Sequence, residues 1–333
     1  MRKCGFALLL ASALALCVSP GEAAKKYSYF RVGAPGDVVR QTTGGTVLMG
    51  GGTDVDQAFQ WMCSRAGNGD FLVIRATGTD AYNPYILQLC PAANSVATLI
   101  VPTSTGANDP FVVNTVRSAE AIFIAGGDQA DYITNWKGTL LQAELNAAIG
   151  RGVPVGGTSA GMMVLTQFVY SALLSQGVTS SQALADPFTK YITLDRDFAA
   201  IDVLTNTIGD SHFVTRDRMG RELAFMCRIA ASGWSSAPRG IAVDEQAALL
   251  VDDAGSATLA GTGAAYFLSA AAPATTCQPK KPLTYQGVAV YRIGPGGSGT
   301  FDLAKWAGGG GTQYQVSANA GVLSSTQSGG LIY

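Results

Sequence analysis

The sequence predicts an α/β fold with a mainly parallel central sheet and helices on both faces. Residues 44–165 alternate short β-like runs with helical runs. The β-like runs are apolar throughout, instead of alternating between apolar and polar positions. Strands of this kind belong to sheets covered on both faces, and strands separated by helices are typical of parallel sheets.

The first strand of this pattern covers residues 46–49 and ends at the three glycines 50–52. A helix follows, and its apolar positions recur at helical spacing: Val55, Ala58, Phe59 and Met62. Asp54 is expected to cap the start of this helix. The next strand covers residues 71–74, and a second helix is expected to open at Pro84.

Two more strands, over residues 98–101 and 121–125, continue the alternation. Residues 140–149 predict a helix, and residues 153–155 predict a strand that runs toward Ser159. The active sites of parallel α/β sheets lie at the carboxyl ends of strands. Both Ser159 and the glycine turn that begins at Gly126 are expected at such ends.

The second half of the chain predicts more strand than helix. Residues 170–200 predict loops with a short helix, and residues 217–230 predict a helix with one apolar face. Four further strands are expected to extend the sheet in antiparallel fashion: residues 240–243, 248–251, 264–268 and 288–292. From Ala307 onward the chain is rich in Gly, Ser, Thr and Gln, which predicts a flexible or loosely packed tail.

Residues 1–24 predict a secretory signal peptide. A basic start precedes an apolar stretch over residues 5–18, which is short for a bilayer, and small residues offer a cleavage site near residue 23 or 24. A lipid anchor at Cys17 is the competing interpretation, and the bulky residue before this cysteine disfavours it. We therefore expect a secreted or periplasmic protein, with a main domain over residues 25–306 and a tail over residues 307–333.

Charge and cysteine content limit the partners and the cofactors. The net charge is −1 and 14% of residues are charged, so neither nucleic acid nor a membrane surface is expected as a partner. An even number of cysteines follows the leader, which predicts two disulfides in an oxidising compartment: Cys63, Cys90, Cys227 and Cys277. The most local pairing is one of three that the sequence allows. No C-x-x-C spacing indicates a zinc site.

The most informative motif is Gly-Thr-Ser-Ala-Gly at residues 157–161, between two apolar runs. It is typical of a nucleophile elbow, in which a strand enters a tight turn, the serine hydroxyl is exposed and a helix leaves. The motif alone is a weak signal in a chain with 41 glycines. A serine nucleophile needs a base, and the chain has one histidine, His212.

Three further segments bear on Ser159. The turn 126–129 follows a strand, so its backbone N–H groups and that of Ala160 are candidates to face an oxyanion, with an ordinary strand-to-helix turn as the alternative. Three arginines near His212 can hold substrate carboxylates or occupy solvated helix positions: Arg216, Arg218 and Arg221. Residues 240–245 end in two acids that can orient the histidine or lie in a turn.

Four motifs, in this order, resemble the cyanophycinase family of serine peptidases. They are Gly-Gly-Asp-Gln at 126–129, Gly-Thr-Ser-Ala-Gly at 157–161, Asp-Ser-His-Phe at 210–213 with the arginines and glycine that follow, and Val-Asp-Glu at 243–245. The resemblance covers roughly residues 44–305. It implies a flavodoxin-like, three-layer α/β/α fold, similar to class I glutamine amidotransferases, with a C-terminal β extension.

The resemblance also implies a role for each motif residue. Ser159 is the implied nucleophile, His212 the general base and Glu245 the acid that orients it. Gly127 and Ala160 supply the implied oxyanion hole. The residues implied to bind substrate are Gln129, Asp210, Arg216, Arg218 and Arg221. No metal or organic cofactor is implied, and a homodimer is implied by the resemblance alone.

The implied activity is that of a secreted exopeptidase that hydrolyses cyanophycin, multi-L-arginyl-poly-L-aspartate, to β-Asp-Arg dipeptides through an acyl-enzyme. The chain departs from the family pattern at Met162, at Ser211 and at residues 52–54, which leaves the substrate open. Two alternatives are a peptidase for small aspartyl or isoaspartyl peptides and a catalytically silent secreted binding protein. The intact set of serine, histidine and glutamate argues against the silent protein.

Overall fold

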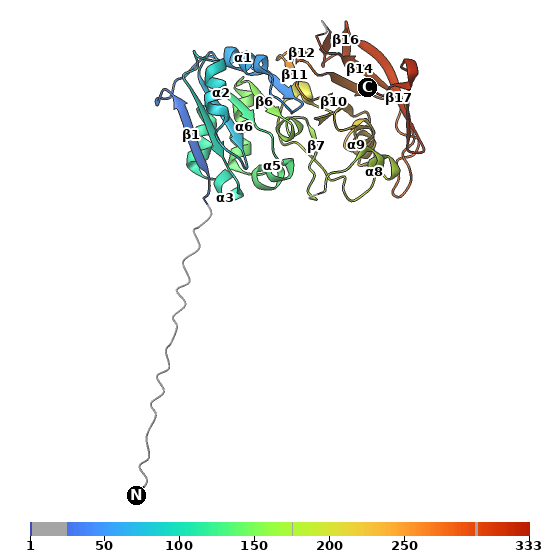
Figure 1. Ribbon diagram of the computed structural model, residues 1–333, viewed down its shortest axis with the longest axis horizontal. Helices are drawn as coiled ribbons and strands as arrows, with labels where there is room; N and C mark the ends of the chain where they lie inside the picture. Colours follow the sequence, from blue (N-terminus) through green and yellow to red (C-terminus); the bar gives the residue numbers. More distant parts are fainter. Residues whose placement is uncertain (2–24, 175, 297–298) are drawn as a thin grey trace.

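The computed structural model describes Met1 and residues 25–174, 176–296 and 299–333 (Figure 1). The predicted signal peptide after Met1, with Cys17, lies outside these residues. Within the described part of the chain, no helix has the length and apolar character needed to cross a bilayer. Two sheets form the core of the protein.

The first sheet has a parallel centre, as the alternating pattern predicts. Five neighbouring strands, from β4 to β2, run parallel, while β1 and β11 flank them in antiparallel orientation. The α/β prediction with a mainly parallel central sheet is therefore confirmed. In spatial order, the described strands of this sheet are β1 (Ser28–Gly33), β4 (Ser95–Ile100), β3 (Asp70–Arg75), β5 (Ala121–Ile124), β6 (Val155–Thr158), β2 (Thr46–Met49), β11 (Ala247–Val251), β12 (Ser256–Gly261), β15 (Thr300–Asp302) and β16 (Ala307–Gly309).

Helices cover both faces of this sheet because its strands are apolar on both sides. Phe71 packs with Phe59 and Ile86 on one face, whereas its neighbour Leu72 packs with Val116 on the other. The first face carries α1 (Asp56–Arg65) and α2 (Tyr82–Leu89). The second carries α3 (Ser104–Ala107), α4 (Pro110–Arg117), α5 (Gln129–Trp136) and α6 (Leu140–Gly150).

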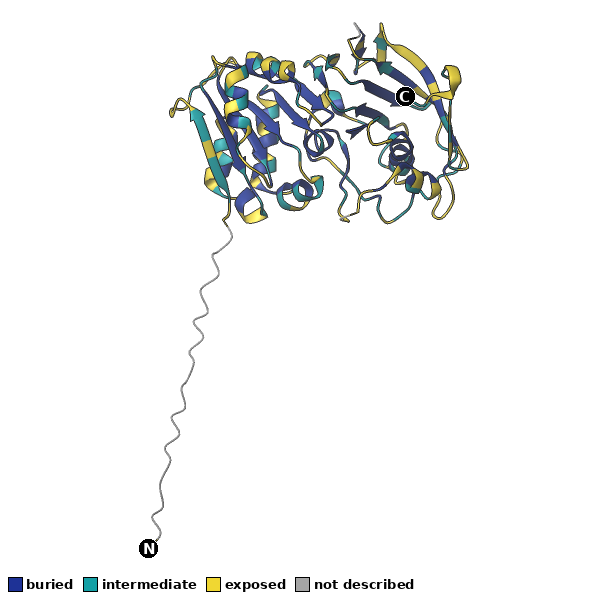
Figure 2. Cartoon of the chain, viewed as in Figure 1, coloured by how far each residue is buried: buried dark blue, intermediate teal, exposed yellow. Residues whose placement is uncertain are grey.

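A second sheet follows in the C-terminal half, in spatial order β18 (Val322–Ser325), β17 (Thr312–Asn319), β14 (Tyr285–Ile293), β13 (Ala265–Ser269), β10 (Arg239–Val243), β9 (Thr207–Asp210), β7 (Phe168–Tyr170) and β8 (Leu194–Arg196). One face packs on the first sheet through Ile241 and Phe267, which share a core with Leu249. The other face packs on α8 (Ser180–Ala185) and α9 (Met219–Ala231), and Figure 2 shows α9 almost wholly buried.

This arrangement corrects the predicted β extension. Of the four strands expected to extend the sheet, only β11 joins the first sheet, where it pairs with β2 in antiparallel fashion. The other three, β10, β13 and β14, belong to the second sheet. The sheet that a strand joins depends on its partner strands, and the sequence of the strand itself carries no local signal for that choice.

Several predicted boundaries also differ. The N-cap of α1 is Val55 and makes no side-chain cap hydrogen bond, so the expected cap at Asp54 is wrong. Helix α2 begins at Tyr82, two residues before Pro84. The strand before Ser159 begins at Val155, because Pro154 has no N–H to donate to a strand ladder. The helix after it, α7 (Ala160–Met163), is a single turn.

The tail is not loosely packed, contrary to the composition-based prediction. Strand β17 pairs with β14 over most of its length, and β18 pairs with β17. Val316 and Ala318 are fully buried in the core of the second sheet. The alternation of buried and exposed residues along β17 explains the ordered strand, whereas composition alone hides this period.

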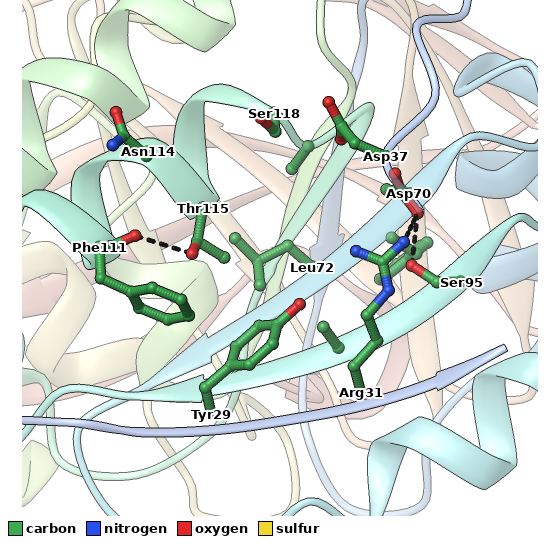
Figure 3. Close-up of a pocket in the computed structure, with 13 residues that line it drawn as sticks. Tyr29, Arg31, Asp37, Asp70, Leu72, Ser95, Phe111, Asn114, Thr115 and Ser118 are labelled. Atoms are coloured by element: carbon green, nitrogen blue, oxygen red, sulfur yellow. Dashed lines mark hydrogen bonds and ion pairs between the residues drawn. The ribbon is translucent and has the colours of Figure 1, made fainter. Parts of the chain in front are cut away.

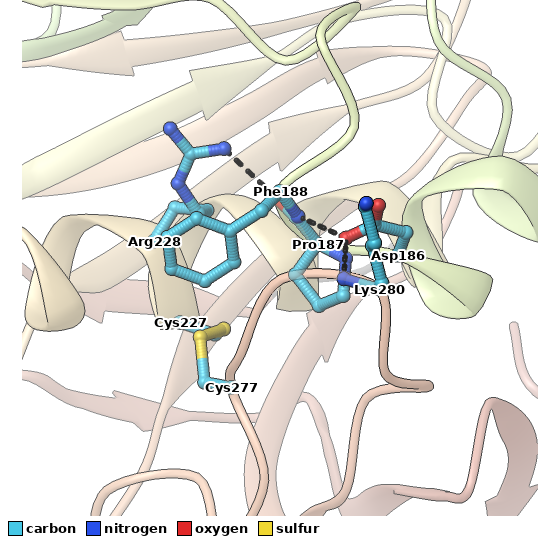
Figure 4. The surroundings of a disulfide bond; sticks show 7 residues. All are labelled: Asp186, Pro187, Phe188, Cys227, Arg228, Cys277 and Lys280. Carbon is cyan, nitrogen blue, oxygen red and sulfur yellow. Dashed lines mark hydrogen bonds between the residues drawn. A yellow bond between two sulfur atoms is a disulfide. The ribbon is translucent and has the colours of Figure 1, made fainter.

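Two disulfides join the four cysteines in the most local of the three pairings: Cys63 with Cys90 and Cys227 with Cys277. The second bond ties α9 to the loop between β13 and β14 (Figure 4). Beside it, Asp186 Oδ1 accepts hydrogen bonds from the backbone N–H groups of Phe188 and Lys280. The same loop region is thus held to α9 and α8 by a covalent bond and by hydrogen bonds.

Candidate active site

Ser159 lies in a tight turn between β6 and α7, with a φ of 53° and a ψ of −116°. Few residues with a side chain adopt this conformation. The motif glycines make it possible, since a Cβ on Gly157 would lie 2.4 Å from the carbonyl group of Gly161. A Cβ on Gly161 would lie 2.0 Å from the carbonyl oxygen of Ile124. The 157–161 motif is therefore a sharp turn that presents the serine hydroxyl at the carboxyl end of the first sheet.

His212 and Glu245 reach this turn from the second sheet. They follow β9 and β10, which are parallel neighbours and so end on the same side. Ser159 Oγ lies 2.8 Å from His212 Nε2, and His212 Nδ1 lies 2.5 Å from Glu245 Oε1. Because a carboxylate accepts hydrogen bonds, Nδ1 carries the hydrogen and Nε2 is left to accept from the serine hydroxyl. The three predicted residues form one hydrogen-bonded chain.

Asp244, the other acid of the 243–245 motif, holds the segment that follows the histidine. We call residues 211–218, between β9 and α9, the histidine loop. Asp244 Oδ1 accepts hydrogen bonds from the backbone N–H groups of Val214 and Thr215, both at 3.0 Å. Of the two acids, Glu245 therefore contacts the imidazole and Asp244 fixes the loop that carries it.

The glycines 50–52, after β2, contact both His212 and Glu245. The backbone N–H of His212 donates to the carbonyl oxygen of Gly50 at 2.8 Å. Gly51 has a φ of +100°, and a Cβ there would lie 2.4 Å from the imidazole ring. A Cβ on Gly52 would lie 3.0 Å from the Glu245 side chain. The sequence signal for this contact is three consecutive glycines that end a predicted strand, and residues 52–54 are also one of the places where the chain departs from the family pattern.

Two backbone N–H groups near Ser159 are candidates to bind an oxyanion. Gly127 and Ala160 both line the cavity in front of the serine. Among the hydrogen bonds of the described residues, neither of their N–H groups has a protein acceptor, whereas the N–H of Ser159 donates to Met49. Both groups are therefore free to donate to a negatively charged oxygen in the cavity.

The cavity has a volume of about 250 Å³. It brings together most of the predicted site residues: Gly127, Gln129, Ser159, Ala160, His212, Arg216, Arg218 and Arg221. Gln129 donates through Nε2 to the carbonyl oxygen of Tyr170 at 3.2 Å. Arg216 is exposed, and among the described residues its side chain makes no hydrogen bond or ion pair.

Asp210 does not line the cavity, because it is fully buried beneath the arginines. Arg221 donates through Nε and Nη2 to its two carboxylate oxygens at 2.7 and 2.5 Å, and Arg218 donates to Oδ1 at 3.2 Å. This buried pairing fixes both guanidinium groups. Asp210 therefore contacts the arginines and has no exposed atom for a substrate in this structure, and Arg216 is the guanidinium left without a partner.

The surroundings of His212 favour its neutral form. Burial lowers the pKa of His212 below its ordinary value; the hydrogen bond to Glu245 acts in the opposite direction, and the charges of Arg216 and Arg218 lower the pKa further. A neutral imidazole is the form that can take a proton from a serine hydroxyl. Burial also lowers the pKa of Arg218 to about 10, which leaves its guanidinium charged at neutral pH.

A second cavity, of about 280 Å³, lies between the edge of the first sheet and α4 (Figure 3). Tyr29 and Phe111 line one end, and Arg31 pairs with Asp70 at the other. None of the predicted site residues lines it. Its hydroxyl groups lack a neighbouring imidazole, because the sole histidine of the chain is His212. The serine and the histidine that can act as a nucleophile and its base therefore lie at the cavity around Ser159.

No group of three or more His, Cys, Asp or Glu side chains that could hold a metal ion occurs within the described residues. Ser159, His212 and Glu245 can supply proton transfer and nucleophilic attack by the serine hydroxyl. Such an arrangement suits acyl transfer from an amide or an ester.

The match to a family model agrees with this chemistry. The sequence profile of "Peptidase family S51" matches residues 47–259. No curated protein sequence matches the chain. The solved structures that are similar include a peptidase from an acI-B1 Actinobacterium, with 17% identity and a TM-score of 0.49 over 68% of this chain and 91% of that one. They also include a candidate peptidase E protein from Listeria monocytogenes EGD-e, with 14% identity and a TM-score of 0.40 over 66% of this chain and 99% of that one.

Proposed function

The chain belongs to peptidase family S51 and is a serine-type peptidase, and from this premise we propose that it cleaves aspartyl peptide bonds through a triad of Ser159, His212 and Glu245. The observation that carries the proposal is the continuous hydrogen-bonded chain from the serine hydroxyl through the imidazole to the carboxylate, at 2.8 and 2.5 Å. Side chains far apart in sequence have no structural need to meet in this order.

In the proposed reaction, Ser159 Oγ attacks the carbonyl carbon of the scissile bond while His212 Nε2 takes the hydroxyl proton. The N–H groups of Gly127 and Ala160 donate to the oxyanion that forms. The C–N bond then breaks, His212 gives its proton to the leaving amine, and an ester on Ser159 remains. Water, activated by the same imidazole, hydrolyses this ester and regenerates the hydroxyl. Glu245 stabilises the imidazolium in both halves.

The proposed substrate is cyanophycin, from which a β-Asp-Arg unit would be released. The support is the charge of the cavity, where three arginines meet a single lining carboxylate, that of Asp128. Arg216 has an unpaired guanidinium suited to bidentate binding of a substrate carboxylate. Asp128 is an exposed residue that lines the same cavity and can pair with a substrate guanidinium. A substrate with an aspartyl carboxylate and an arginyl side chain satisfies both.

We also propose that the enzyme acts outside the cytoplasm, after removal of residues 1–24 as a signal peptide. The support is the leader pattern of the sequence together with the two disulfides, which persist in oxidising compartments. Mass spectrometry of the N-terminus of protein recovered from the culture medium or the periplasm tests this. A mature N-terminus near residue 25 is expected, and an intact N-terminus on protein confined to the cytoplasm would contradict it.

The substrate is tested by adding the purified mature protein to insoluble cyanophycin and following dipeptide release. We expect β-Asp-Arg from the unmodified protein and none from the Ser159→Ala variant. Cleavage of small isoaspartyl peptides without attack on cyanophycin would favour the narrower dipeptidase activity. Equal release by the variant, or no cleavage of either substrate, would contradict the proposal and leave the silent binding protein as the better account.

A further inference from the structure

Tyr333 contacts the histidine loop, although it lies outside the part of the chain that the family profile matches, residues 47–259. Its ring packs edge-on against Phe213, the residue after His212, with centroids 5.6 Å apart and an interplanar angle of 89°. Its hydroxyl accepts a hydrogen bond from the backbone N–H of Met219 at 2.9 Å and donates to Asp217 Oδ1 at 2.8 Å.

The segment that carries Tyr333 is fixed to the second sheet. Tyr314, on β17, donates through its hydroxyl to the carbonyl oxygen of Ile332 at 3.0 Å. Gln327 donates through Nε2 to the carbonyl oxygen of Leu331 at 2.9 Å. In Figure 1 the C-terminus lies over the strands of this sheet. The position of Tyr333 is thus set by a pairing of strands that is independent of the histidine loop.

The hydroxyl binds a side chain of the histidine loop, whose backbone is strained at His212 and at Asp217, and the first N–H group of α9. Asp217 has a φ of 48°, in the left-handed region. Met219 is the first residue of α9, and the first N–H groups of a helix have no partner within it. Burial raises the pKa of Tyr333, and the neighbouring Asp217 raises it further, so the hydroxyl keeps its proton at neutral pH and continues to donate.

We infer that Tyr333 is a positioning residue, which fixes the histidine loop so that His212 faces Ser159 and Arg216 faces the cavity. The contact between the Tyr333 ring and Phe213 fixes the residue next to His212. The hydrogen bond to Asp217 fixes the residue between Arg216 and Arg218, two of the three arginines that line the cavity. This inference rests on the proposed catalytic role of His212 and not on the identity of the peptide substrate.

The test uses a fluorophosphonate probe, which reports on the serine whatever the natural substrate is. Ser159 Oγ forms a bond to phosphorus, the P–F bond breaks, fluoride leaves and His212 takes the hydroxyl proton. For Tyr333→Phe we expect labelling about tenfold slower, the size of one lost hydrogen bond. The acid limb of the pH profile should also move toward the ordinary histidine pKa, because the loosened loop admits water to the imidazole.

The matched control is Tyr291→Phe, which removes a hydroxyl bonded to the carbonyl oxygens of Thr300 and Gly309, away from the histidine loop. Its labelling rate and pH profile should equal those of the unmodified protein. Asp217→Asn is a second variant, since asparagine tolerates the left-handed backbone but loses the charge that the phenol binds. Asp217→Asn should also slow labelling, and the double variant with Tyr333→Phe should label only slightly more slowly than either single variant.

Two results would overturn the inference, and they are distinguishable. If the unmodified protein labels at Ser159 but folded Tyr333→Phe labels at the same rate with the same pH profile, the positioning role is wrong and the proposed function stands. If the unmodified protein does not label at all, the catalytic assignment of Ser159 and His212 fails, and the inference fails with it.

Discussion

At the scale of single residues, the protonation of His212 sets the pH range in which the proposed triad can work. Burial lowers the pKa of this imidazole, so the neutral base persists below the ordinary histidine value of about 6.5. The charges of two arginines contribute to this shift, and Arg216 is the larger of the two contributors. The acid limb of the pH profile is therefore a direct readout of the electrostatics of the cavity.

We predict that kcat/KM falls on the acid side at a pH below 6.5 and that Arg216→Ala moves this limb to higher pH. Removing a positive charge makes the imidazolium less unfavourable, so the base is lost at a higher pH. Arg40→Ala removes an exposed charge outside the cavity and should leave the limb in place. A limb that moves downward in Arg216→Ala, or equally in both variants, would contradict the assignment of His212 as the base.

Glu222 is a second residue with an unusual environment. It is fully buried on α9, and neither of its carboxylate oxygens has a hydrogen-bond partner among the described residues. Burial raises the pKa of Glu222 well above its ordinary value, and the charge of Asp210 raises it further while Arg221 lowers it. Folding therefore favours the neutral form of this carboxyl group.

The raised pKa of Glu222 makes its contribution to the stability of the folded protein depend on pH. A group whose pKa is raised by folding favours the folded state below its unfolded pKa of about 4.3, and this contribution falls by up to about 1.4 kcal/mol per pH unit above it. When the free energy of unfolding is measured in urea, that of Glu222→Gln should therefore increase relative to that of the unmodified protein as the pH rises. Burial raises the pKa of Glu144, but two arginines lower it below its ordinary value. The free energy of unfolding of Glu144→Gln should therefore decrease relative to that of the unmodified protein as the pH rises. Parallel pH profiles for Glu222→Gln and the unmodified protein would refute this.

At the scale of elements, the site is assembled where strands of two sheets end. Strands β2 and β6 of the first sheet place the glycines 50–52 beside Ser159, because they are parallel neighbours. Strands β9 and β10 of the second sheet deliver His212 and Glu245 in the same way. The turns after these strands must therefore fit closely against one another, and a Cβ added to Gly51 would overlap the imidazole.

We predict that Gly51→Ala lowers kcat by about 100-fold or more, since a displacement of about 1 Å at a catalytic group has this effect. The new Cβ would lie 2.4 Å from the His212 ring, which must move away. Gly138→Ala is the matched control, with a φ of +74° and no atom within 4 Å of the added Cβ. Both variants should lose stability from the strained backbone. Full activity in Gly51→Ala would show that the glycine turn does not set the position of the imidazole.

At the scale of the whole molecule, much of the first sheet and the key motif residues could be predicted from the sequence. The alternation of strands and helices is a local signal, and the two glycines of the 157–161 motif predict the sharp turn around Ser159. The contact of Gly51 with His212 could not be predicted, because it joins residues far apart in the chain. The burial of Asp210 under Arg221 was missed for a related reason, since an acid beside arginines gives no sign of whether it faces inward or toward a substrate.

The C-terminal half was the hardest part to predict. Four of its strands are predicted from the sequence, yet the membership of three of them in a second sheet depends on partner strands that no local pattern reveals. The tail after Ala307 was wrongly predicted to be loose, because its glycines and small polar residues mask the alternation along β17. This same tail ends in the segment that places Tyr333 on the histidine loop.

The disulfide between Cys227 and Cys277 joins α9, the helix that follows the histidine loop, to the loop between β13 and β14. The bond spans 50 residues, whereas Cys63 and Cys90 are 27 apart. Replacing both Cys227 and Cys277 by serine should lower the free energy of unfolding by about 2–4 kcal/mol in urea, and slightly less for the shorter pair. An unchanged unfolding midpoint in both double variants would contradict a stabilising role for these bonds.

The central claim is that Ser159 carries the acyl group during turnover. The most direct measurement is intact-protein and peptide mass spectrometry on samples acid-quenched within the first turnovers on an aspartyl peptide ester or on cyanophycin. The predicted result is an added mass equal to the acyl part of the substrate, mapped to the peptide that contains Ser159 and absent from Ser159→Ala. An adduct on another residue, or turnover by Ser159→Ala at the rate of the unmodified protein, would contradict the account.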